Sequence, residues 1–292
     1  MSLSFSQPLL ESLRELGELK RVRSAGRPGS VAERLFLSGW SILVGGASTS
    51  DAAATSVASA LAAARLGDLD LPTLAELGIE RTDALGILEQ AAHSMPGIAA
   101  GSFPEPDLPP GAIPAFARLL AEQPRAGVTC PGRPRLMLEP PENHAEHCLT
   151  VAVYGALLAP GFGADPATVW LAGMAHHLHN AFMPDAGFTG EMLLGRHLEP
   201  AMRRTTDRAL RELPSALAAR VEEARLLLPD AETPGGRAFH AADTLDRVWQ
   251  IDQHLRAGRT SLRFVLDDMA LVHDGPVKPF QDDVLRAAGL LP

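Results

Sequence analysis

Apolar residues recur at intervals of three and four along most of this 292-residue chain, and alternating polar and apolar runs are rare. This spacing puts the apolar side chains on one face of an α-helix, whereas a half-buried strand needs strict alternation. The sequence therefore predicts an all-α fold. A chain of this length can bury a real core and form one large or two smaller domains.

Helix ends are expected where a capping residue or a glycine coincides with this spacing. Residues 31–44 run up to the Gly45–Gly46 pair, a plausible stop. Asp165 followed by Pro166 is typical of a helix start, with the aspartate as cap and the proline at the first helical position. The predicted helices cover residues 31–44, 51–66 (capped by Ser50 or Asp51), 83–94 (capped by Thr82), 115–122, 143–158, 165–182, 198–213, 215–228 and 237–257.

Two stretches rich in proline and glycine interrupt the helices, at residues 96–114 and 123–143. Such stretches break helices, so the second one is expected to separate two regions. The predicted division is an N-terminal helical region of unknown role at 1–125, a linker at 126–142, a second helical domain at 143–258, and a C-terminal extension at 259–292 that packs on it.

Charge and composition exclude several classes of protein. The formal net charge of -9 argues against nucleic-acid binding through a general basic field. The sequence contains no run of 18 or more apolar residues, so no membrane span is predicted. The N-terminus lacks the pattern of a secretory signal. Cys130 and Cys148 are the only cysteines, too few for a disulfide framework. We therefore expect a cytoplasmic protein without nucleic-acid or membrane partners.

Histidines cluster in the second region, where six of the ten in the chain lie between residues 144 and 197. On helices, residues three apart share a face. This relation holds for His144 and His147, for His176 and His179, and for His240 and Asp243. Three helices that each offer such a pair could surround a metal ion, and imidazole with carboxylate suits Zn²⁺, Mn²⁺, Fe²⁺, Co²⁺ or Ni²⁺.

A single histidine on a helix is more often a surface group or a hydrogen-bonded core group than a ligand. His176 and His177, however, follow the apolar run VWLAGMA, which is too hydrophobic for a solvated face. We expect both to lie at a buried helix end, where unpaired polar groups are costly and need partners.

Three motifs together resemble the HD-domain superfamily of metal-dependent phosphohydrolases, nearest to its 5'-deoxynucleotidase-like branch. They are ENHAEHC at 142–148, AGMAHHLHNAFMPD at 172–185 and ADTL at 242–245. The resemblance covers about residues 140–258 and implies an HD-domain helical bundle preceded by an additional N-terminal helical region. It implies the metal ligands His147, His176 and Asp243, with His177 at the position of the HD aspartate.

This replacement changes the expected metal chemistry. A site of three histidines and one carboxylate carries one negative charge fewer and favours a softer metal such as Zn²⁺ or Fe²⁺ over Mg²⁺. His177 also removes the carboxylate that bridges two ions in dinuclear members. We therefore expect one divalent transition metal. His179 stands where the family tends to have a small residue and is not expected to be a ligand.

The catalytic positions also depart from the family pattern. Asn180 occupies the position of a glutamate in this branch, and an amide can orient a water but cannot take its proton. Asp185 matches the second acidic position and is the candidate base or acid, with a cap or turn role as the alternative.

A phosphate substrate also needs cationic contacts. Arg237, near the start of the helix that carries Asp243, is the preferred candidate. The other candidates are Arg133, Arg135, Arg203 and Arg204. The alternative for each arginine is a solvated surface role.

The leading functional hypothesis is a metal-dependent phosphohydrolase that acts on a small phosphate ester such as a nucleotide. One alternative is a catalytically degenerate HD domain with a binding or regulatory role, favoured by His177 and Asn180. A further alternative is a di-iron oxygenase of the HD type, with His197 as an extra ligand. The role of residues 1–125, including a homodimer contact, stays open.

Overall fold

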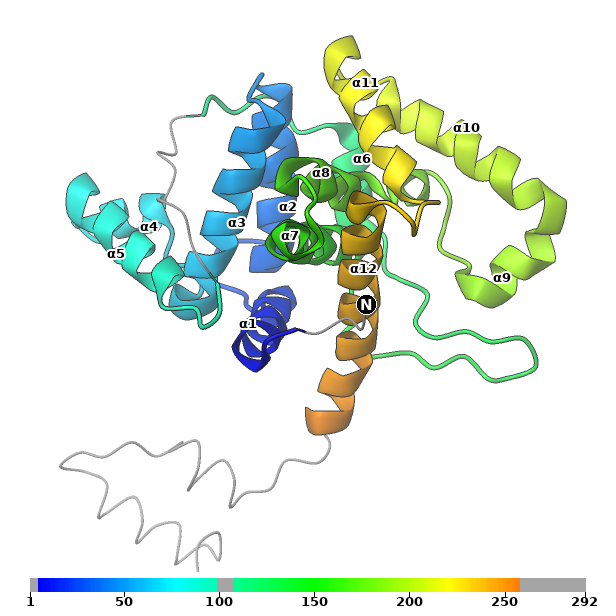
Figure 1. Cartoon of the computed structure of the whole chain (residues 1–292), viewed down its shortest axis with the longest axis horizontal. Helices are drawn as coiled ribbons and strands as arrows, with labels where there is room; N and C mark the ends of the chain where they lie inside the picture. The colour runs from blue at the N-terminus through cyan, green and yellow to red at the C-terminus, as the bar shows by residue number, and fades with distance from the viewer. Residues whose placement is uncertain (1–4, 99–107, 258–292) are drawn as a thin grey trace, which may run out of the picture. The chain divides into compact units, whose positions relative to one another are not determined.

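The computed structural model describes residues 5–98 and 108–257 and confirms the all-α prediction (Figure 1). Within these residues the chain forms α-helices and short 3-10 helices, and its only β-type pairings are isolated bridges. None of the helices in the described part is long and apolar enough to cross a membrane.

The elements follow one another in this order: α1 (Gln7–Gly17), η1 (Glu18–Lys20), α2 (Val31–Val44), α3 (Thr49–Leu66), α4 (Leu71–Glu76), α5 (Arg81–His93), α6 (Ala115–Glu122), α7 (His144–Phe162), α8 (Pro166–Ala175), η2 (Leu178–Ala181), α9 (Gly187–Leu194), η3 (Gly195–His197), α10 (Leu198–Leu210), α11 (Ser215–Ala224), η4 (Arg225–Leu227) and α12 (Pro234–Ala257).

Helices α2 and α6 have the predicted ends, whereas several others differ by a few residues. The cap of α3 is Ser48, whose hydroxyl accepts a hydrogen bond from the Asp51 amide, so the expected Ser50 or Asp51 cap is wrong. Helix α5 begins after Glu80 rather than after Thr82. Helix α7 continues past Pro160, because a proline in the last turn removes only one backbone hydrogen bond.

The largest difference concerns the helix expected over residues 165–182. Asp165 caps α8 as predicted, but the helix ends at Ala175. Two side chains satisfy carbonyls of its last turn: the Arg225 guanidinium donates to the Ala175 carbonyl, and His176 Nδ1 donates to the Gly173 carbonyl. Since these carbonyls are satisfied, the chain can leave the helix and continue through the 3-10 helix η2.

The C-terminal helices also differ at their ends. Helix α10 ends at Leu210 rather than at residue 213, and α11 ends at Ala224 and passes into η4. Helix α12 begins at Pro234, three residues before the expected start, because proline is favourable in a first turn.

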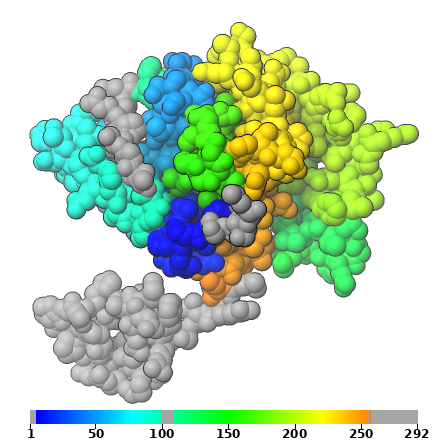
Figure 2. Space-filling model, viewed as in Figure 1, coloured from blue at the N-terminus to red at the C-terminus, as the bar shows by residue number. Residues whose placement is uncertain are grey.

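Helix α7 lies in the interior of the fold, and most of its side chains are buried all around the helix. Such a helix must be covered on every side. Figure 1 shows α7 and α8 between α2 and α3 on one side and α11 and α12 on the other. In Figure 2 the green central part of the chain is visible between the blue N-terminal helices and the yellow C-terminal ones.

The closest helix packing is between α7 and α8. Gly173 permits it, because a Cβ atom at this position would collide with the backbone of Ala152. The same packing brings the C-terminal end of α8 to the N-terminal end of α7, where the histidines lie.

The first of two compact units extends to Trp249, and the second begins at Gln250. Helices on both sides of the expected 126–142 linker belong to the first unit, and their buried side chains form one hydrophobic core. In the second unit, the described residues continue α12 to Ala257. The expected extension at 259–292 lies outside the described residues.

Candidate metal centre

The N-terminal end of α7 is fixed by a capping box. The side chain of Asn143 accepts a hydrogen bond from the Glu146 amide, and the Glu146 carboxylate accepts one from the Asn143 amide, at 2.9 Å each. This arrangement satisfies two amides that a helix start otherwise leaves unpaired. It places His144 and His147 in the first turn of α7, where both are fully buried.

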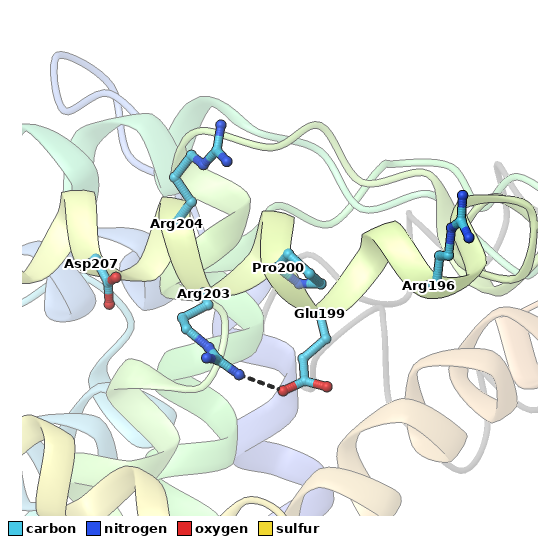
Figure 3. Close-up of a pocket in the computed structure, with 6 residues that line it drawn as sticks. All are labelled: Arg196, Glu199, Pro200, Arg203, Arg204 and Asp207. Carbon is cyan, nitrogen blue, oxygen red and sulfur yellow. Dashed lines mark hydrogen bonds and ion pairs between the residues drawn. The ribbon is translucent and has the colours of Figure 1, made fainter.

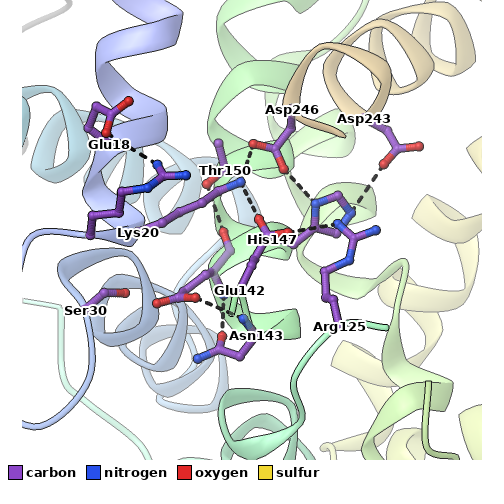
Figure 4. Close-up of polar contacts among 12 residues, drawn as sticks. Glu18, Lys20, Ser30, Arg125, Glu142, Asn143, His147, Thr150, Asp243 and Asp246 are labelled. Atoms are coloured by element: carbon purple, nitrogen blue, oxygen red, sulfur yellow. Dashed lines mark hydrogen bonds and ion pairs between the residues drawn. The ribbon is translucent and has the colours of Figure 1, made fainter. Parts of the chain in front are cut away.

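His147 lies between two carboxylates of α12 (Figure 4). Its Nδ1 is 2.7 Å from Asp246 Oδ2, and its Nε2 is 3.3 Å from Asp243 Oδ1. The shorter contact favours a proton on Nδ1, since a carboxylate can only accept. Nε2 is then the nitrogen that points to the centre of the histidine cluster.

His176 faces His147 from the end of α8. Its Nδ1 donates to the Gly173 carbonyl oxygen at 2.6 Å, and its Nε2 lies 3.1 Å from His147 Nε2. With both Nδ1 atoms protonated, two lone pairs point at each other across this distance. Either a proton or a metal cation must lie between them.

His177 is the third imidazole of the cluster. Its Nδ1 is 2.8 Å from Asn180 Oδ1, while the amide nitrogen of Asn180 donates to the Met183 carbonyl at 3.3 Å. This second bond identifies the oxygen of the amide as the atom that faces His177. His177 Nδ1 is therefore a donor too, and its Nε2 is free.

The three histidines fit a metal ion by the chemistry of their donor atoms. One nitrogen from each of His147, His176 and His177 lies within 4.8 Å of those of the other two. Each ring has its Nδ1 bonded to an acceptor, an arrangement typical of metal-binding histidines because it fixes the tautomer and the ring. Asp243 is not part of this group, but its Oδ1 lies 3.3 Å from His147 Nε2; with Asp243 as fourth ligand the set would be three nitrogens and one oxygen, which suits Zn²⁺ and related ions.

The protonation states agree with this chemistry. Burial holds the pKa of His176 and of His177 well below the usual value, so both rings are neutral, as a ligand must be. Burial alone would raise the pKa of Asp243, but the hydrogen bond and charge of His147 keep it well below its ordinary value. Asp243 is therefore an anionic carboxylate.

A second acidic group, formed by Glu142, His147 and Asp246, already contains a cation. Lys20 Nζ lies 2.5 Å from Glu142 Oε1 and 2.5 Å from Asp246 Oδ1. Burial lowers the pKa of Lys20, but the two carboxylates raise it above its ordinary value, so the ammonium stays charged. Because Lys20 fills this position, the histidine cluster is the better candidate for a metal site.

Arg125 adds a second, partly buried cation beside these acids (Figure 4). Its guanidinium is 3.3 Å from Glu142 Oε2. Burial lowers the pKa of Arg125, but the neighbouring carboxylates, Glu142 first, raise it. Burial would likewise raise the pKa of Glu142, but Lys20 and Arg125 lower it to about 2. Glu142 is therefore ionised.

Asp185, the candidate acid or base, accepts hydrogen bonds from the Ala126 amide at 2.9 Å and the Gly187 amide at 2.8 Å. Its carboxylate also lies 3.5 Å from His144 Nε2. Burial would raise the pKa of Asp185, but these contacts hold it well below its usual value. Asp185 thus has the contacts of a positioning carboxylate, and Asn180 positions His177.

The structure brings His147, His176 and His177 together, with Asp243 beside His147, but it does not place the expected arginines beside them. Arg237 stacks over Phe162, with 5.7 Å from the guanidinium carbon to the ring centroid. Phe162 is fifteen residues beyond His147 on α7, or about 22 Å along the helix. Arg133 is exposed on the 126–142 segment, and Arg135 donates to the carbonyls of Ala126 and Ala186.

Arg203 and Arg204 line a surface hollow on α10 (Figure 3). The hollow is lined by acidic as well as basic side chains, and Arg203 forms an ion pair with Glu199 at 2.7 Å. His197, the possible extra ligand, is exposed in η3. Among the described residues, neither His197 nor His240 belongs to a cluster of three side chains that could bind one metal ion.

Sequence reasoning missed four residues around His147: Lys20, Arg125, Glu142 and Asp246. Asp246 could have been found, because it lies three residues after Asp243 and hence on the same helix face. No sequence pattern could have indicated Lys20 as part of the site, because 226 residues separate it from Asp246.

Comparisons with protein-family models, curated proteins and solved structures gave no match for this chain.

Proposed function

We propose that His147, His176, His177 and Asp243 bind one divalent transition metal, and that the protein is a metal-dependent phosphohydrolase of the HD type. The observation that carries the proposal is the state of the three imidazoles. Each has its Nδ1 bonded to an acceptor, so each would bind a metal through Nε2; at His147 the metal would replace the proton through which Nε2 contacts Asp243. The partial exposure of His177 and Asp243 leaves the cluster accessible from solvent.

When bound, such a metal supplies Lewis-acid chemistry: it polarises a phosphoryl oxygen and lowers the pKa of a water to about 7. Among the chain's own groups, His144 is the candidate to take a proton. Its ring lies 4.7 Å from that of His177, and its Nε2 faces Asp185. This pairing favours a proton on Nε2 and leaves Nδ1 as the acceptor.

Arg247 is the candidate phosphate contact. It lies one helical turn after Asp243 on α12, with its Nη1 3.6 Å from Asp243 Oδ2 and 61% of its side chain exposed. An exposed guanidinium beside a metal ligand can bind the oxygens of a small phosphate ester. The proposed substrate is therefore a small phosphorylated molecule such as a nucleotide.

A binding or regulatory role without turnover is the second candidate. The engagement of Asn180 and Asp185 favours it. Asn180 bonds His177 and the Met183 carbonyl, and Asp185 bonds two backbone amides. In this case the metal centre would serve structure or ligand binding.

The test combines metal analysis with a phosphatase screen on nucleoside monophosphates. We expect one metal per wild-type chain and turnover that Asp243→Ala reduces at least 100-fold. Asp207→Ala, an exposed aspartate on α10, is the matched control and should retain both properties. Metal without turnover would favour the binding role, and a chain without metal would refute both candidates.

A further inference from the structure

Lys20 connects the N-terminal region to the histidine cluster (Figure 4). It is the last residue of η1, and only 3% of its side chain is exposed. Its ammonium contacts Asp246 Oδ1, while Asp246 Oδ2 contacts His147 Nδ1. Both carboxylate oxygens of Asp246 are thus engaged, one by a fixed cation and the other by a proposed metal ligand.

Stability alone is a poor explanation for this buried lysine. Removing an ammonium and two carboxylates from water carries a large desolvation cost, and proteins in which apolar residues of similar volume replace such a group are often equally stable or more so. The arrangement has a clear geometric effect, however. Because Lys20 holds one oxygen of Asp246, the other oxygen is held toward His147 Nδ1.

We infer that Lys20 and Asp246 are positioning residues of the metal centre, which hold His147 with its Nε2 directed at His176 and thereby set the metal affinity. The inference rests on the proposed metal site. It gives the N-terminal region a role in the site, since Lys20 lies more than 120 residues before the first ligand. Loss of such an outer contact typically weakens metal binding 10- to 100-fold.

The two carboxylates that contact Lys20 provide a matched pair of variants. Asp246→Asn and Glu142→Gln each remove one negative charge at 2.5 Å from Lys20 Nζ. Only Asp246 also contacts His147. We expect Asp246→Asn to raise the dissociation constant for Zn²⁺ about 10- to 100-fold, whereas Glu142→Gln should change it by less than about 3-fold.

Lys20 itself is tested in the Glu142→Gln background, where Lys20→Met takes the lysine cation from one carboxylate rather than from two. This double variant should bind Zn²⁺ at least about 10-fold more weakly than Glu142→Gln alone. Thermal unfolding in the presence of a chelator identifies variants that fail to fold. Imidazole ¹⁵N NMR of the metal-free protein provides a signature that a merely structural role would not move: Nδ1–H in the wild type and a mixture of tautomers in Asp246→Asn.

Chelator competition with Zn²⁺ distinguishes the two proposals. If the wild type binds no Zn²⁺, the proposed metal site itself is wrong, and the positioning role falls with it. If the wild type binds Zn²⁺ and Asp246→Asn binds it as tightly as Glu142→Gln does, the metal site stands and the positioning role is overturned. A His147 tautomer that is unchanged in Asp246→Asn would overturn it as well.

Discussion

At the scale of single residues, the decisive feature is which nitrogen of each imidazole is occupied. A carboxylate, a backbone carbonyl and an amide oxygen engage Nδ1 of His147, His176 and His177. In the proposed site, His177 would bind the metal through Nε2, at the position where the resemblance to the HD motif expects an aspartate. His177 should therefore influence which metal binds.

Substitution of His177 by aspartate tests this point. The variant His177→Asp replaces a neutral nitrogen ligand with an anionic oxygen, which favours harder ions. We expect the preference for Zn²⁺ over Mn²⁺ to fall at least several-fold, measured by chelator competition with each metal. An unchanged preference would mean that His177 does not contact the ion.

Protonation of buried histidines should make the metal-free protein sensitive to acid. Burial, and then the charge of Arg225, lower the pKa of His179 to about 4, against about 6.5 in an unfolded chain. Between these values the unfolded state binds a proton that the native state does not. The free energy of unfolding therefore decreases as pH falls from 6.5 to 4, by up to about 1.4 kcal/mol per pH unit for this residue.

The variant His179→Gln removes this contribution. Urea unfolding in chelator at a series of pH values should give a slope shallower by up to about 1.4 kcal/mol per pH unit. His176 and His177 act in the same direction and remain in both proteins. Equal slopes for the wild type and the variant would contradict the prediction.

At the scale of helices, much of the fold could be predicted from sequence, because helix ends depend on local signals. The 31–44 helix ends at a Gly-Gly pair, and Asp165–Pro166 begins α8 as expected. The end of α8 could not be predicted, since Arg225, fifty residues away, supplies a donor to Ala175. The motifs likewise indicated the histidines but not Lys20, which no local pattern connects to Asp246.

The caps of α7 and α8 allow an element-scale prediction. Asn143→Ala and Asp165→Ala each remove a cap and should lower the free energy of unfolding by about 1 kcal/mol. Only Asn143 begins the turn that holds His147, so only Asn143→Ala should weaken Zn²⁺ binding, by several-fold. Denaturant unfolding and chelator competition measure the two effects, and equal Zn²⁺ affinities would contradict the prediction.

At the scale of the whole molecule, the N-terminal helices and the histidine cluster belong to one compact unit. Trp40 of α2 packs edge-to-face on Phe116 of α6 at 4.9 Å between ring centroids, and α2 packs on α7. A ligand that binds only the native state at α7 should therefore stabilise α2 as well.

Zn²⁺ at 100 times its dissociation constant should raise the free energy of unfolding by about 2.7 kcal/mol. We expect hydrogen exchange in α2 and α3 to slow together with that in α7 and α8, and no such effect in Asp243→Ala. Protection confined to α7 and α8 would show that the N-terminal helices unfold independently.

The most direct test of the central claim is the X-ray absorption spectrum of the wild-type protein after loading with Zn²⁺ and removal of excess metal. The proposal predicts one ion per chain with three imidazole nitrogens and one oxygen at about 2.0–2.2 Å. The spectrum of the His177→Ala variant should show one imidazole ligand fewer than that of the wild type. A protein that retains no zinc, or a zinc ion without imidazole ligands, would contradict the account.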